Sequence, residues 1–363
     1  MSSRSGDIIF LLGAGASKEA EIPMSAEMIG EIETLLREHS DWQPFQQLYN
    51  HVKSSIHFSA GLKGVFGWSV PFNIETLVNT LYELERNEEH PLYPFIAAWN
   101  SRFVSLADAD FSNVRKFRRL ILKELKRWMC PENTSASSYY DGMKNLQDDL
   151  NYPLHVFSLN YDLCVEAIGK RNTFRVETGF EDCGPNHFWD WERFEQQENG
   201  PPSVPDLYLY KLHGSINWKR NDEANLFSVE QIENVASDKM EVIFGRDFKL
   251  EAADPYLFYA YQFRKFTLDA RLIVVIGYSF SDSHINKMLV QALRRDEHRR
   301  LLVVSRCKNR TECRQKVKEV AERLDVDETL ILAETGTAKA FLESTDLAEL
   351  LHGRIPDIGG TPF

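Results

Sequence analysis

Cysteine is scarce in this chain, and its spacing excludes the common structural uses of the residue. The 363 residues contain 5 cysteines, namely Cys130, Cys164, Cys183, Cys307 and Cys313. No two of them form a C-x-x-C pair, and a scattered, odd set argues against a disulfide framework or a four-cysteine zinc site. Cys183 and His187 are close enough in sequence to reach one metal ion, although loop residues of these types are usually unliganded. We therefore expect no zinc.

Long apolar runs are also missing. Runs such as Ile8–Leu12 and Leu272–Ile276 are far shorter than the roughly 20 residues that a membrane-spanning helix needs. The first residues lack the profile of a secretory signal peptide. There is no G-x-x-x-x-G-K-S/T phosphate-binding loop, so any ATP hydrolysis has to come from another protein. These absences predict a cytoplasmic protein without membrane contact.

Basic residues are not in excess. The formal net charge of -12 at pH 7 argues against a surface that generally coats nucleic acid, without excluding a local basic groove. Basic residues do gather between Arg115 and Arg127, where apolar residues punctuate them. A solvated helix face is the ordinary explanation, and a nucleic-acid or subunit contact is the more specific one. We expect nucleic acid to be bound, if at all, only through a complex.

What the chain does contain is an alternation of short apolar runs and helical patterns. The runs are rich in Val, Ile and Leu and mostly do not alternate, which is typical of strands buried on both faces of a parallel sheet. They are Ile8–Leu12, Leu154–Leu159, Leu207–Leu212, Glu241–Phe244, Leu272–Ile276 and Leu301–Ser305. Apolar residues three and four apart predict helices at Met24–Arg37, Ile74–Arg86, Val114–Trp128, Asp282–Arg295 and Glu312–Leu324. This order predicts an α/β fold, a Rossmann-like doubly wound parallel sheet.

The first two predicted strands are unusually far apart. About 140 residues separate Leu12 from Leu154, whereas one βαβ crossover needs roughly 30. We interpret residues 24–150 as a helical insertion lobe within a domain spanning 7–306, followed by a C-terminal helical or α/β extension and tail over 307–363. Residues 180–206 show no periodicity and indicate a long loop, in which Trp189 and Trp191 could line a lid or a subunit contact.

Four motifs follow predicted strands, at the edge where open α/β sheets bind ligands. The first lacks the third glycine of G-x-G-x-x-G, because Lys18 occupies its place. Each has an ordinary alternative, since Asn160, Asp162 and Asp282 could cap helices and His213 could be a core histidine. Their joint occurrence at one edge favours a ligand site. The motifs are Gly13–Ser17, Ser158–Asp162, Lys211–Ser215 and Gly277–Asp282.

The residue types in these motifs suit cleavage of an N-glycosidic bond to nicotinamide. That reaction passes through an oxocarbenium-like transition state, so the site must hold the pyrophosphate, orient the ribose and direct a nucleophile at the anomeric carbon. Gly13 and Gly15 suit the pyrophosphate. Asn160 can bind ribose hydroxyls or a water, Asp162 can accept from the nicotinamide amide, and His213 can take a proton from a ribose hydroxyl or from water.

The four motifs together resemble those of the sirtuin superfamily, in particular the sirtuin-like NAD-cleaving domains of bacterial anti-phage defence systems. Gly13-Ala14-Gly15-Ala16-Ser17 is similar to the first glycine motif of the family, and Ile22-Pro23 falls where its Ile-Pro follows. Asn160-Tyr161-Asp162 is similar to its Asn-x-Asp, and Leu212-His213-Gly214 matches the segment with the catalytic histidine. Gly277-Tyr278-Ser279-Phe280, with Asp282, looks like the later Gly-x-Ser loop that contacts NAD.

The resemblance spans roughly residues 7–306 and implies a role for individual residues. It implies that Asn160 and His213 are catalytic and that Asp162 faces nicotinamide. It also implies that Ser305, after the last strand, contacts the adenosine half of NAD, and Asn73-Ile74-Glu75 resembles a helix start of the defence branch. The NAD-binding residues so implied are Gly13, Ala14, Gly15, Ser17, Asp162, Gly277, Ser279, Asp282 and Ser305.

Two departures separate the chain from deacylating sirtuins. Those enzymes carry a zinc module with two C-x-x-C pairs, which is absent here, and Met24-Ser25-Ala26 stands where their Asp-Phe-Arg follows the Ile-Pro. The resemblance therefore implies hydrolysis of NAD+ to nicotinamide and ADP-ribose rather than peptide deacylation. It further implies NAD depletion in anti-phage defence, controlled by assembly as a homo-oligomer or by a partner such as a HerA-type ATPase or another sensor protein.

Two alternatives stay open at this point. The chain could be a non-catalytic module that binds NAD or ADP-ribose within a defence complex. It could also be a nucleic-acid-processing subunit that works with a partner ATPase through the basic residues 115–127. The sequence leaves open the trigger, the partner, the oligomer size, the activity of the chain alone, and hydrolysis against cyclisation as the product-forming step.

Overall fold

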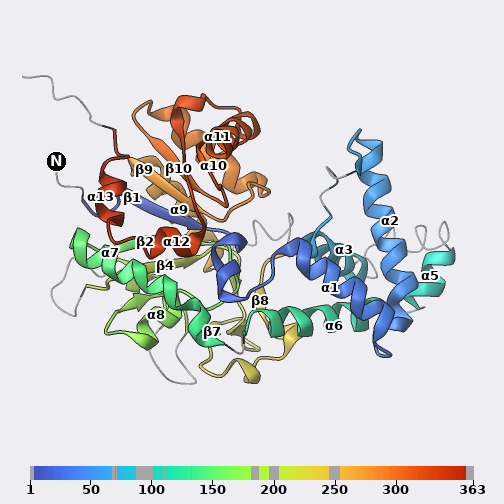
Figure 1. Ribbon diagram of the computed structural model, residues 1–363. Coiled ribbons are helices and arrows are strands. Elements are labelled where there is room, and N and C mark those ends of the chain that lie inside the picture. Colours follow the sequence, from blue (N-terminus) through green and yellow to red (C-terminus); the bar gives the residue numbers. More distant parts are fainter. Residues whose placement is uncertain are drawn as a thin grey trace, which may run out of the picture.

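A seven-stranded parallel sheet forms the centre of the computed structural model (Figure 1). The structure describes residues 4–67, 70, 72–86, 101–108, 111–131, 133–180, 188–195, 204–244 and 254–356. The strand order is β11-β10-β9-β1-β2-β4-β3. The strands are β1 (Ile8–Leu12), β2 (Leu154–Ser158), β3 (Val176–Glu177), β4 (Leu207–Lys211), β9 (Leu272–Ile276), β10 (Arg300–Val304) and β11 (Ile331–Glu334).

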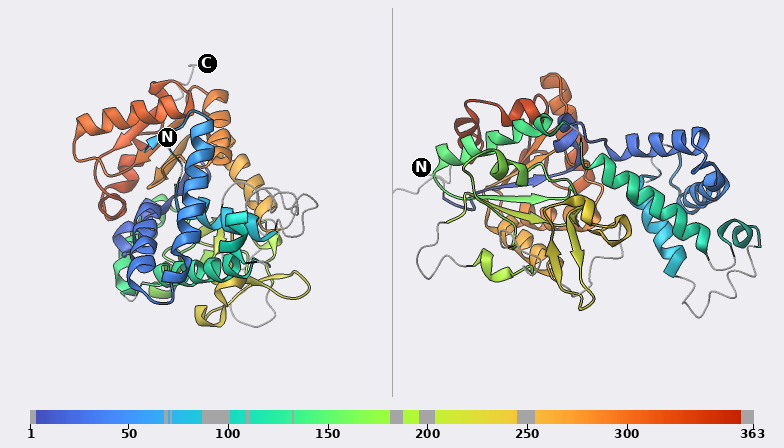
Figure 2. Two further views of the ribbon diagram at one scale, coloured as in Figure 1. Left: turned by 90° about the vertical axis from the view of Figure 1, so that its right-hand side faces the viewer. Right: turned by 90° about the horizontal axis from the view of Figure 1, so that it is seen from below.

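Helices cover both faces of this sheet (Figure 2). One face packs against α7 (Gly142–Leu150), α8 (Glu166–Arg171), α12 (Ala338–Leu342) and α13 (Leu347–His352). The other packs against α9 (Tyr256–Asp269), α10 (Ser283–Arg295) and α11 (Arg310–Leu324). Strands buried on both faces explain the continuous apolar runs of the sequence. The predicted Rossmann-like, doubly wound parallel fold is confirmed, with the order of the strands reversing at β1.

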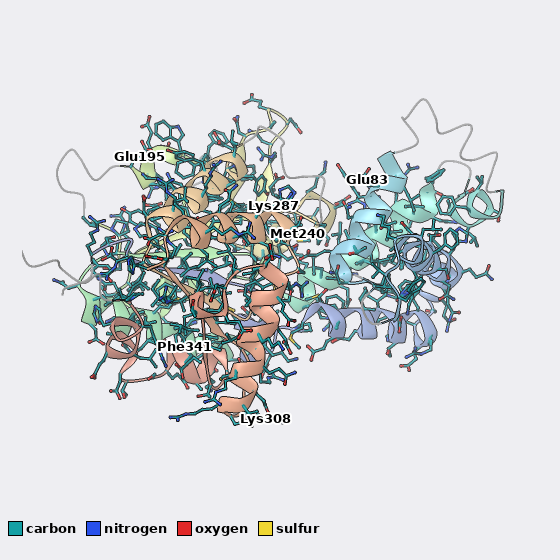
Figure 3. The ribbon with its side chains drawn as sticks, turned by 90° about the horizontal axis from the view of Figure 1, so that it is seen from above. Glu83, Glu195, Met240, Lys287, Lys308 and Phe341 are labelled. Carbon is teal, nitrogen blue, oxygen red and sulfur yellow. The ribbon has the colours of Figure 1, made fainter. Side chains whose placement is uncertain are left out.

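Most of the helices inserted between β1 and β2 stand to one side of the sheet as a separate lobe (Figure 1). They are α1 (Ser25–Glu38), α2 (Gln46–Leu62), α3 (Ile74–Arg86), α5 (Ser101–Ala107) and α6 (Ser112–Trp128). Phe117 of α6 is fully buried and lies at the centre of the lobe, where its ring contacts those of Trp42, Phe45 and Tyr49. Figure 3 shows the same division with side chains drawn, since Glu83 lies on the lobe and Phe341 on the sheet-containing part.

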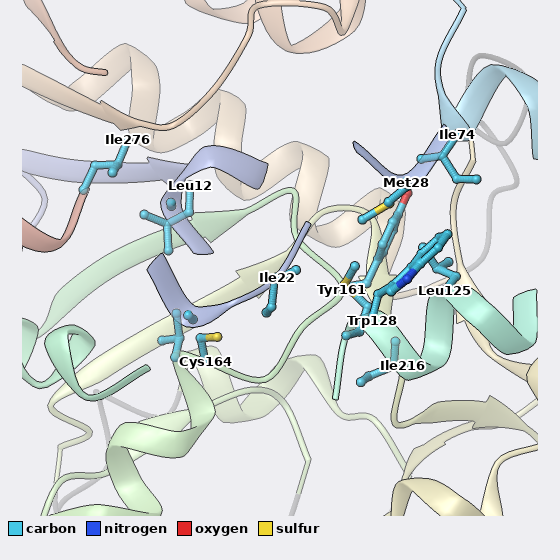
Figure 4. Close-up of a cluster of buried hydrophobic side chains, with 14 of the residues drawn as sticks. Leu12, Ile22, Met28, Ile74, Leu125, Trp128, Tyr161, Cys164, Ile216 and Ile276 are labelled. Carbon is cyan, nitrogen blue, oxygen red and sulfur yellow. The ribbon is translucent and has the colours of Figure 1, made fainter. Parts of the chain in front are cut away.

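The lobe and the sheet share one hydrophobic cluster rather than forming two isolated cores. Met28, Ile74 and Trp128 of the lobe belong to the same cluster as Leu12 of β1. Figure 4 shows the three lobe residues close to Tyr161, while Leu12 lies further along the cluster near Ile276. The chain returns from the lobe through η5 (Thr134–Asp141) and then α7, which lies against the sheet rather than in the lobe. The end of the inserted segment is therefore packed directly beside the strands.

One predicted strand differs in the structure. The run Glu241–Phe244 is not a strand of the main sheet, because only β8 (Glu241–Val242) forms and it pairs antiparallel with β5 (Gly214–Ser215). Glu241 pairs there with Arg220 at 3.0 Å, as suits a half-exposed ribbon. β6 (Trp218–Arg220) and β7 (Leu226–Ser228) form a second antiparallel pair. Short 3-10 helices complete the description at η1 (Ala14–Ala20), η2 (Gln43–Phe45), η6 (Trp191–Phe194), η8 (Ile232–Asn234), η9 (Ser237–Lys239) and η11 (Glu328–Leu330).

The predicted loop 180–206 is described only in part. Trp189 packs against Phe258 and donates its indole N–H to the Tyr259 hydroxyl at 2.8 Å, whereas Trp191 is 43% exposed. The possible metal pair Cys183 and His187 lies outside the described residues. Among the helices that the structure describes, none is both long and apolar enough to cross a membrane.

Candidate functional site

The strand register brings the predicted motifs to one edge of the sheet. Leu12, the last residue of β1, is level with Ser158 of β2 on one side and with Ile276 of β9 on the other. Lys211 of β4 is level with Ser158, and Val304 of β10 with Ile276. The residues after these strand ends therefore follow one another along the carboxyl edge, across the point where the strand order reverses. In open α/β sheets this is where ligands bind.

The glycine turns after β1 and β9 interlock. Gly13 N donates to Ile276 O and Gly15 N donates to Gly277 O, both at 2.9 Å. A Cβ on Gly13 would lie 2.6 Å from Tyr278 Cα, and one on Gly277, whose φ is 65°, would lie 2.1 Å from Ala16 N. These glycines are thus required by the contact between the two turns, which is a different reason from the approach to a ligand that the sequence suggested.

The helix after the first turn also begins earlier than predicted. η1 starts at Ala14, directly after Gly13, and α1 follows separately at Ser25. Within this turn the N–H groups of Gly13, Gly15 and Ala16 donate to Ile276 O, Gly277 O and Gly13 O respectively. Three backbone donors that could have faced a pyrophosphate are used within the protein. The exposed residues at the interlocked turns are Ala14, Ser279 and Ser281.

Asn160, directly after β2, is held against the first glycine turn. Its side chain is buried, with the residue only 8% exposed, and Nδ2 donates to Gly13 O at 3.0 Å and to Ser17 Oγ at 3.2 Å. Ser17 Oγ lies 2.9 Å from the hydroxyl of Tyr140, which belongs to η5. The predicted cofactor residue Ser17 therefore contacts the predicted catalytic residue Asn160, through a network that includes a tyrosine the sequence did not single out.

Asp162 makes a local hydrogen bond in the turn that precedes α8. Its Oδ1 accepts a hydrogen bond from Cys164 N at 3.0 Å, and the residue is buried. Burial, and next the Asp162 carboxylate, raise the pKa of the Cys164 thiol well above its ordinary value. The predicted capping alternative is wrong for Asp162, because α8 begins only at Glu166 and its N-cap is Val165.

His213 lies beyond the end of β4 and faces the second glycine turn. Its Nε2 is 3.3 Å from Asp282 Oδ2, and its ring centroid is 6.4 Å from that of Tyr161. Its Nδ1 is buried, and the residues that the structure describes supply it no hydrogen-bond partner. The side chains of His213 and Asp282 are 13% and 14% exposed. His213 is therefore not the backbone-bonded core histidine of the ordinary alternative.

Asp282 makes two contacts with its two oxygens. Oδ1 accepts from the backbone N–H groups of His284 at 2.8 Å and Ile285 at 3.3 Å, which makes Asp282 the N-cap of α10. Oδ2 faces His213. Both the capping role and the contact within the predicted site hold for the same carboxylate, so the helix cap fixes the position from which it meets the imidazole.

Two further predicted segments are Ser305, which follows β10, and Asn73-Ile74-Glu75, which begins α3. Ser305 follows β10, whose Val304 O accepts from Gly277 N at 3.0 Å, and its hydroxyl is 3.6 Å from Cys307 Sγ. Asn73 Oδ1 caps α3 by accepting from Thr76 N at 2.7 Å. Burial, and next the Glu75 carboxylate, raise the pKa of Tyr161 well above its ordinary value. The lobe thus brings a charge close to the strand edge.

Lys211 is a site residue that the sequence analysis did not assign. It is 1% exposed, and its Nζ donates to Glu166 Oε1 at 3.0 Å, to Ser215 Oγ at 2.9 Å and to the carbonyl of Asp162. A buried lysine must be paired, because an isolated buried charge is strongly unfavourable. The available signal was a lysine closing an otherwise apolar strand immediately before Leu-His-Gly. These hydrogen bonds of Lys211 connect the segment after β2, which contains Asn160, to the segment after β4, which contains His213.

Within the described ranges, no group of three or more His, Cys, Asp or Glu side chains is arranged to hold a metal ion. A groove of about 900 Å³ does lie beside η1, between α1 and the end of α6. Lys18, Glu27, Arg127 and Trp128 contribute to its lining. Its charges pair with one another, as Lys18 with Glu27 at 2.5 Å and Arg127 with Glu31 at 3.5 Å.

The comparison with protein families gives one match. The model of the SIR2-like domain matches residues 154–325, a segment that contains Asn160, His213 and the Gly277 turn, while the Gly13 turn lies before it. This match supports the sirtuin-like superfamily that the motifs indicated. No curated protein sequence matches the chain.

Three of the similar solved structures have Sir2 in their descriptions. One is described as a complex of a Sir2 homologue with NAD, with 12% identity, a TM-score of 0.42, and coverage of 96% of this chain and 90% of the other. One on the mechanism and regulation of Sir2 enzymes has 12% identity, a TM-score of 0.42, and coverage of 96% and 94%. A Sir2 variant with a deacetylated p53 peptide and 3'-O-acetyl ADP-ribose has 10% identity, a TM-score of 0.42, and coverage of 96% and 94%.

Proposed function

We propose that this chain is an NAD+ glycohydrolase that releases nicotinamide and ADP-ribose at the carboxyl edge of its sheet. The observation that carries the proposal is the state of His213. One imidazole nitrogen faces a carboxylate, the other has no hydrogen-bond partner within the described part of the chain, and the ring lies along the same edge as Asn160 and the glycine turns. The SIR2-like match of residues 154–325 supports NAD+ as the ligand.

The contact with Asp282 assigns the proton on His213. A carboxylate accepts hydrogen bonds, so Nε2 carries the hydrogen that faces Oδ2. Nδ1, to which no described residue donates, is then left as an acceptor. An imidazole acceptor at the edge of a ligand site is suited to take a proton from water or from a ribose hydroxyl. As the imidazolium forms, the Asp282 carboxylate stabilises its charge, as in other histidine–carboxylate pairs.

The remaining predicted residues take their proposed roles from their places along the edge. Asn160 orients a water or a ribose hydroxyl, and Asp162 lies beside it for the nicotinamide amide. The turn Gly13–Ser17 and the hydroxyl of Ser279 are placed for the pyrophosphate and ribose, because they are neighbours in space. Ser305, one strand further along, would meet the adenosine half. NAD+ is bound as the substrate in this proposal, and hydrolysis uses water as the acceptor.

The test is product formation from NAD+ and from a fluorescent etheno-NAD, with nicotinamide and ADP-ribose separated by chromatography. We expect Asn160→Ala and His213→Ala to abolish release of nicotinamide while the fold is retained. Exposed residues of the same types, Asn234 and His298, provide matched controls, so Asn234→Ala and His298→Ala should keep full activity. Full activity in both site variants would rule out this site.

We further infer that the activity serves NAD depletion in anti-phage defence and is controlled by assembly. The support is the resemblance of the motifs to defence-type sirtuin-like domains, and the harm that unchecked NAD loss would do to the host. A homo-oligomer, or a complex with a HerA-type ATPase or another sensor protein encoded beside this chain, would provide the control. Light scattering and product analysis, with and without the neighbouring protein, test this. A strict monomer with unchanged activity in both cases contradicts it.

A binding module without catalysis is the second candidate, and one observation favours it. Both N–H groups of the Asn160 amide, and the N–H groups of Gly13, Gly15 and Ala16, donate to protein acceptors. Such a site offers a ligand fewer hydrogen-bond donors than a phosphate-binding turn usually does. The discriminating result is a raised melting temperature with NAD+ or ADP-ribose while no nicotinamide is released.

The nucleic-acid alternative gains no such support from the basic helix α6. Arg118 pairs with Glu85 at 2.8 Å and Arg119 with Asp238 at 3.0 Å. Arg127 contacts Glu31 and Glu124. Basic side chains that are already paired favour the interpretation of this face as a structural contact, within the lobe and between the lobe and η9.

A further inference from the structure

A short chain of buried polar groups connects the exit of the helical lobe to Asn160. Tyr140 of η5 is fully buried, and its hydroxyl lies 2.9 Å from Ser17 Oγ, which is fully buried as well. Ser17 Oγ in turn accepts from Asn160 Nδ2 at 3.2 Å. Tyr140, Ser17 and Asn160 come from three segments that are far apart in the sequence. Sequence reasoning could assign Ser17 and Asn160 to a site, but nothing in it pointed to Tyr140.

The partners of Asn160 fix which way its amide points. A backbone carbonyl such as Gly13 O can only accept, so the NH2 end of the amide must face it. The second N–H goes to Ser17 Oγ, and both donors are then used. The described residues supply no hydrogen bond to Oδ1. Asn160 therefore presents an acceptor to a ligand, and the pair Ser17 and Tyr140 holds that orientation.

Removing the Tyr140 hydroxyl would remove the contact that fixes the orientation of the Asn160 amide, without changing a group that contacts a ligand. A hydroxyl rotates to suit its partners, so without Tyr140 the Ser17 side chain is no longer fixed toward Asn160. Catalysis is sensitive to such changes, because groups that direct a water or a ribose must keep their angle closely. The hydroxyl is fully buried, so no water replaces it without space being made.

From this geometry we propose that Tyr140 is a positioning residue for Asn160 and acts through the hydroxyl of Ser17. As far as turnover is concerned, the inference rests on the proposed NAD+ hydrolysis. The orientation of the amide is a property of the chain alone and can be measured separately. The role also gives the lobe a direct connection to the site, because η5 is the segment through which the chain leaves the lobe.

The kinetic experiment compares Tyr140→Phe with Tyr210→Phe, which also removes one buried tyrosine hydroxyl but from a contact with His155. We expect Tyr140→Phe to lower kcat about tenfold with KM changed less than about twofold, because orientation rather than affinity is lost. Tyr210→Phe should leave both constants unchanged. In a Ser17→Ala background, Tyr140→Phe should cause no further loss. An unchanged kcat in Tyr140→Phe, or a full further loss in that background, overturns the proposal.

A second readout does not depend on activity. Selective 15N labelling of asparagine displays side-chain NH2 signals, and the Asn160 pair is identified by its disappearance in Asn160→Ala. We expect its hydrogens to exchange with water at least about tenfold faster in Tyr140→Phe and at the wild-type rate in Tyr210→Phe. Equal exchange in all three proteins overturns the proposal. If the wild type releases no nicotinamide, the proposed function fails, and the exchange rates still decide the role of Tyr140.

Discussion

Two histidines on neighbouring strands show how differently the two ends of the sheet are built. His155 lies near the start of β2, stacked on Tyr208 with ring centroids 5.2 Å apart, and both of its nitrogens have polar partners, the Ser5 and Tyr210 hydroxyls, each at 3.3 Å. His213 lies beyond the end of β4 and faces the Asp282 carboxylate, and among the residues described here its other nitrogen has no hydrogen-bond partner. The first is built into the core, and the second is placed at an edge.

The difference teaches what to look for when a sequence offers several histidines. Burial, and next the charge of Lys265, lower the pKa of His155 to about 3, so its ring stays neutral in the folded protein. Its contacts are complete, which is the usual state of a buried polar group. Among the described residues, His213 has a hydrogen-bond partner at only one of its two nitrogens, and that partner is the charged Asp282 carboxylate. The predictions below set one histidine against the other.

The largest expected effect is on turnover. His213→Ala should lower nicotinamide release by about 10²–10⁴-fold, the usual contribution of a general base. His155→Ala should keep the wild-type rate per folded molecule, since the ring lies at the other end of the strands. Initial rates normalised to the folded fraction provide the measurement. Equal losses in the two variants would remove the distinction between the two histidines.

For the free energy of unfolding we expect the opposite, with the larger loss in His155→Ala. His155→Ala should lower the free energy of unfolding by about 2–4 kcal/mol, because it leaves a cavity among Tyr208, Phe266 and Tyr210. His213→Ala should lower it by less than about 1 kcal/mol, as expected for a residue with few contacts. Urea unfolding followed by circular dichroism measures both. A larger loss for His213→Ala would mean that His213 is structural after all.

A smaller effect is expected from the partner of His213. Asp282→Asn keeps a good N-cap for α10 but removes the negative charge that faces the imidazole. We expect nicotinamide release to fall about tenfold to a hundredfold while the melting temperature changes by less than about 2 °C. A variant with wild-type turnover would show that the carboxylate serves the helix alone.

The smallest effect is a pH dependence that His155 imposes on stability. Its folded pKa of about 3 lies below its ordinary value of 6.5, so between these values the unfolded chain binds a proton that the folded chain does not. Stability should therefore fall on acidification, by about 1 kcal/mol for each pH unit below about pH 6. His155→Gln, which cannot titrate, should show a shallower loss in urea unfolding at a series of pH values. Parallel curves for the two proteins contradict the assignment.

The sheet could be predicted because its strands are marked by composition alone. Runs such as Leu272–Ile276 are buried on both faces and consist of aliphatic residues, so pattern and structure agree. β11 was missed because only its first residue is buried and Glu334 closes it. The aromatic helix α9 was missed because large side chains lie all around it, which hides the amphipathic period.

The site could be predicted as far as the strand ends but not beyond. Parallel strands in register bring Asn160, His213 and both glycine turns to one edge, and the sequence order suffices for that inference. The hydrogen-bond partners of these site residues could not be predicted, since Tyr140 and Lys211 contact Ser17 and Asp162, which are distant from them in the sequence. The reason for the glycines was also hidden, because it lies in the contact between two turns.

The interlocked turns have a practical consequence for anyone who wants to retune what this edge accepts. Positions 13, 15 and 277 are closed to engineering, since any side chain there would meet the backbone of the opposing turn. Ala14, Ser279 and Ser281 belong to the same two turns, and their exposed side chains can be replaced by larger ones. For the proposed NAD+ site, a library confined to those three is the way to change ligand selectivity while leaving the interlocked turns intact.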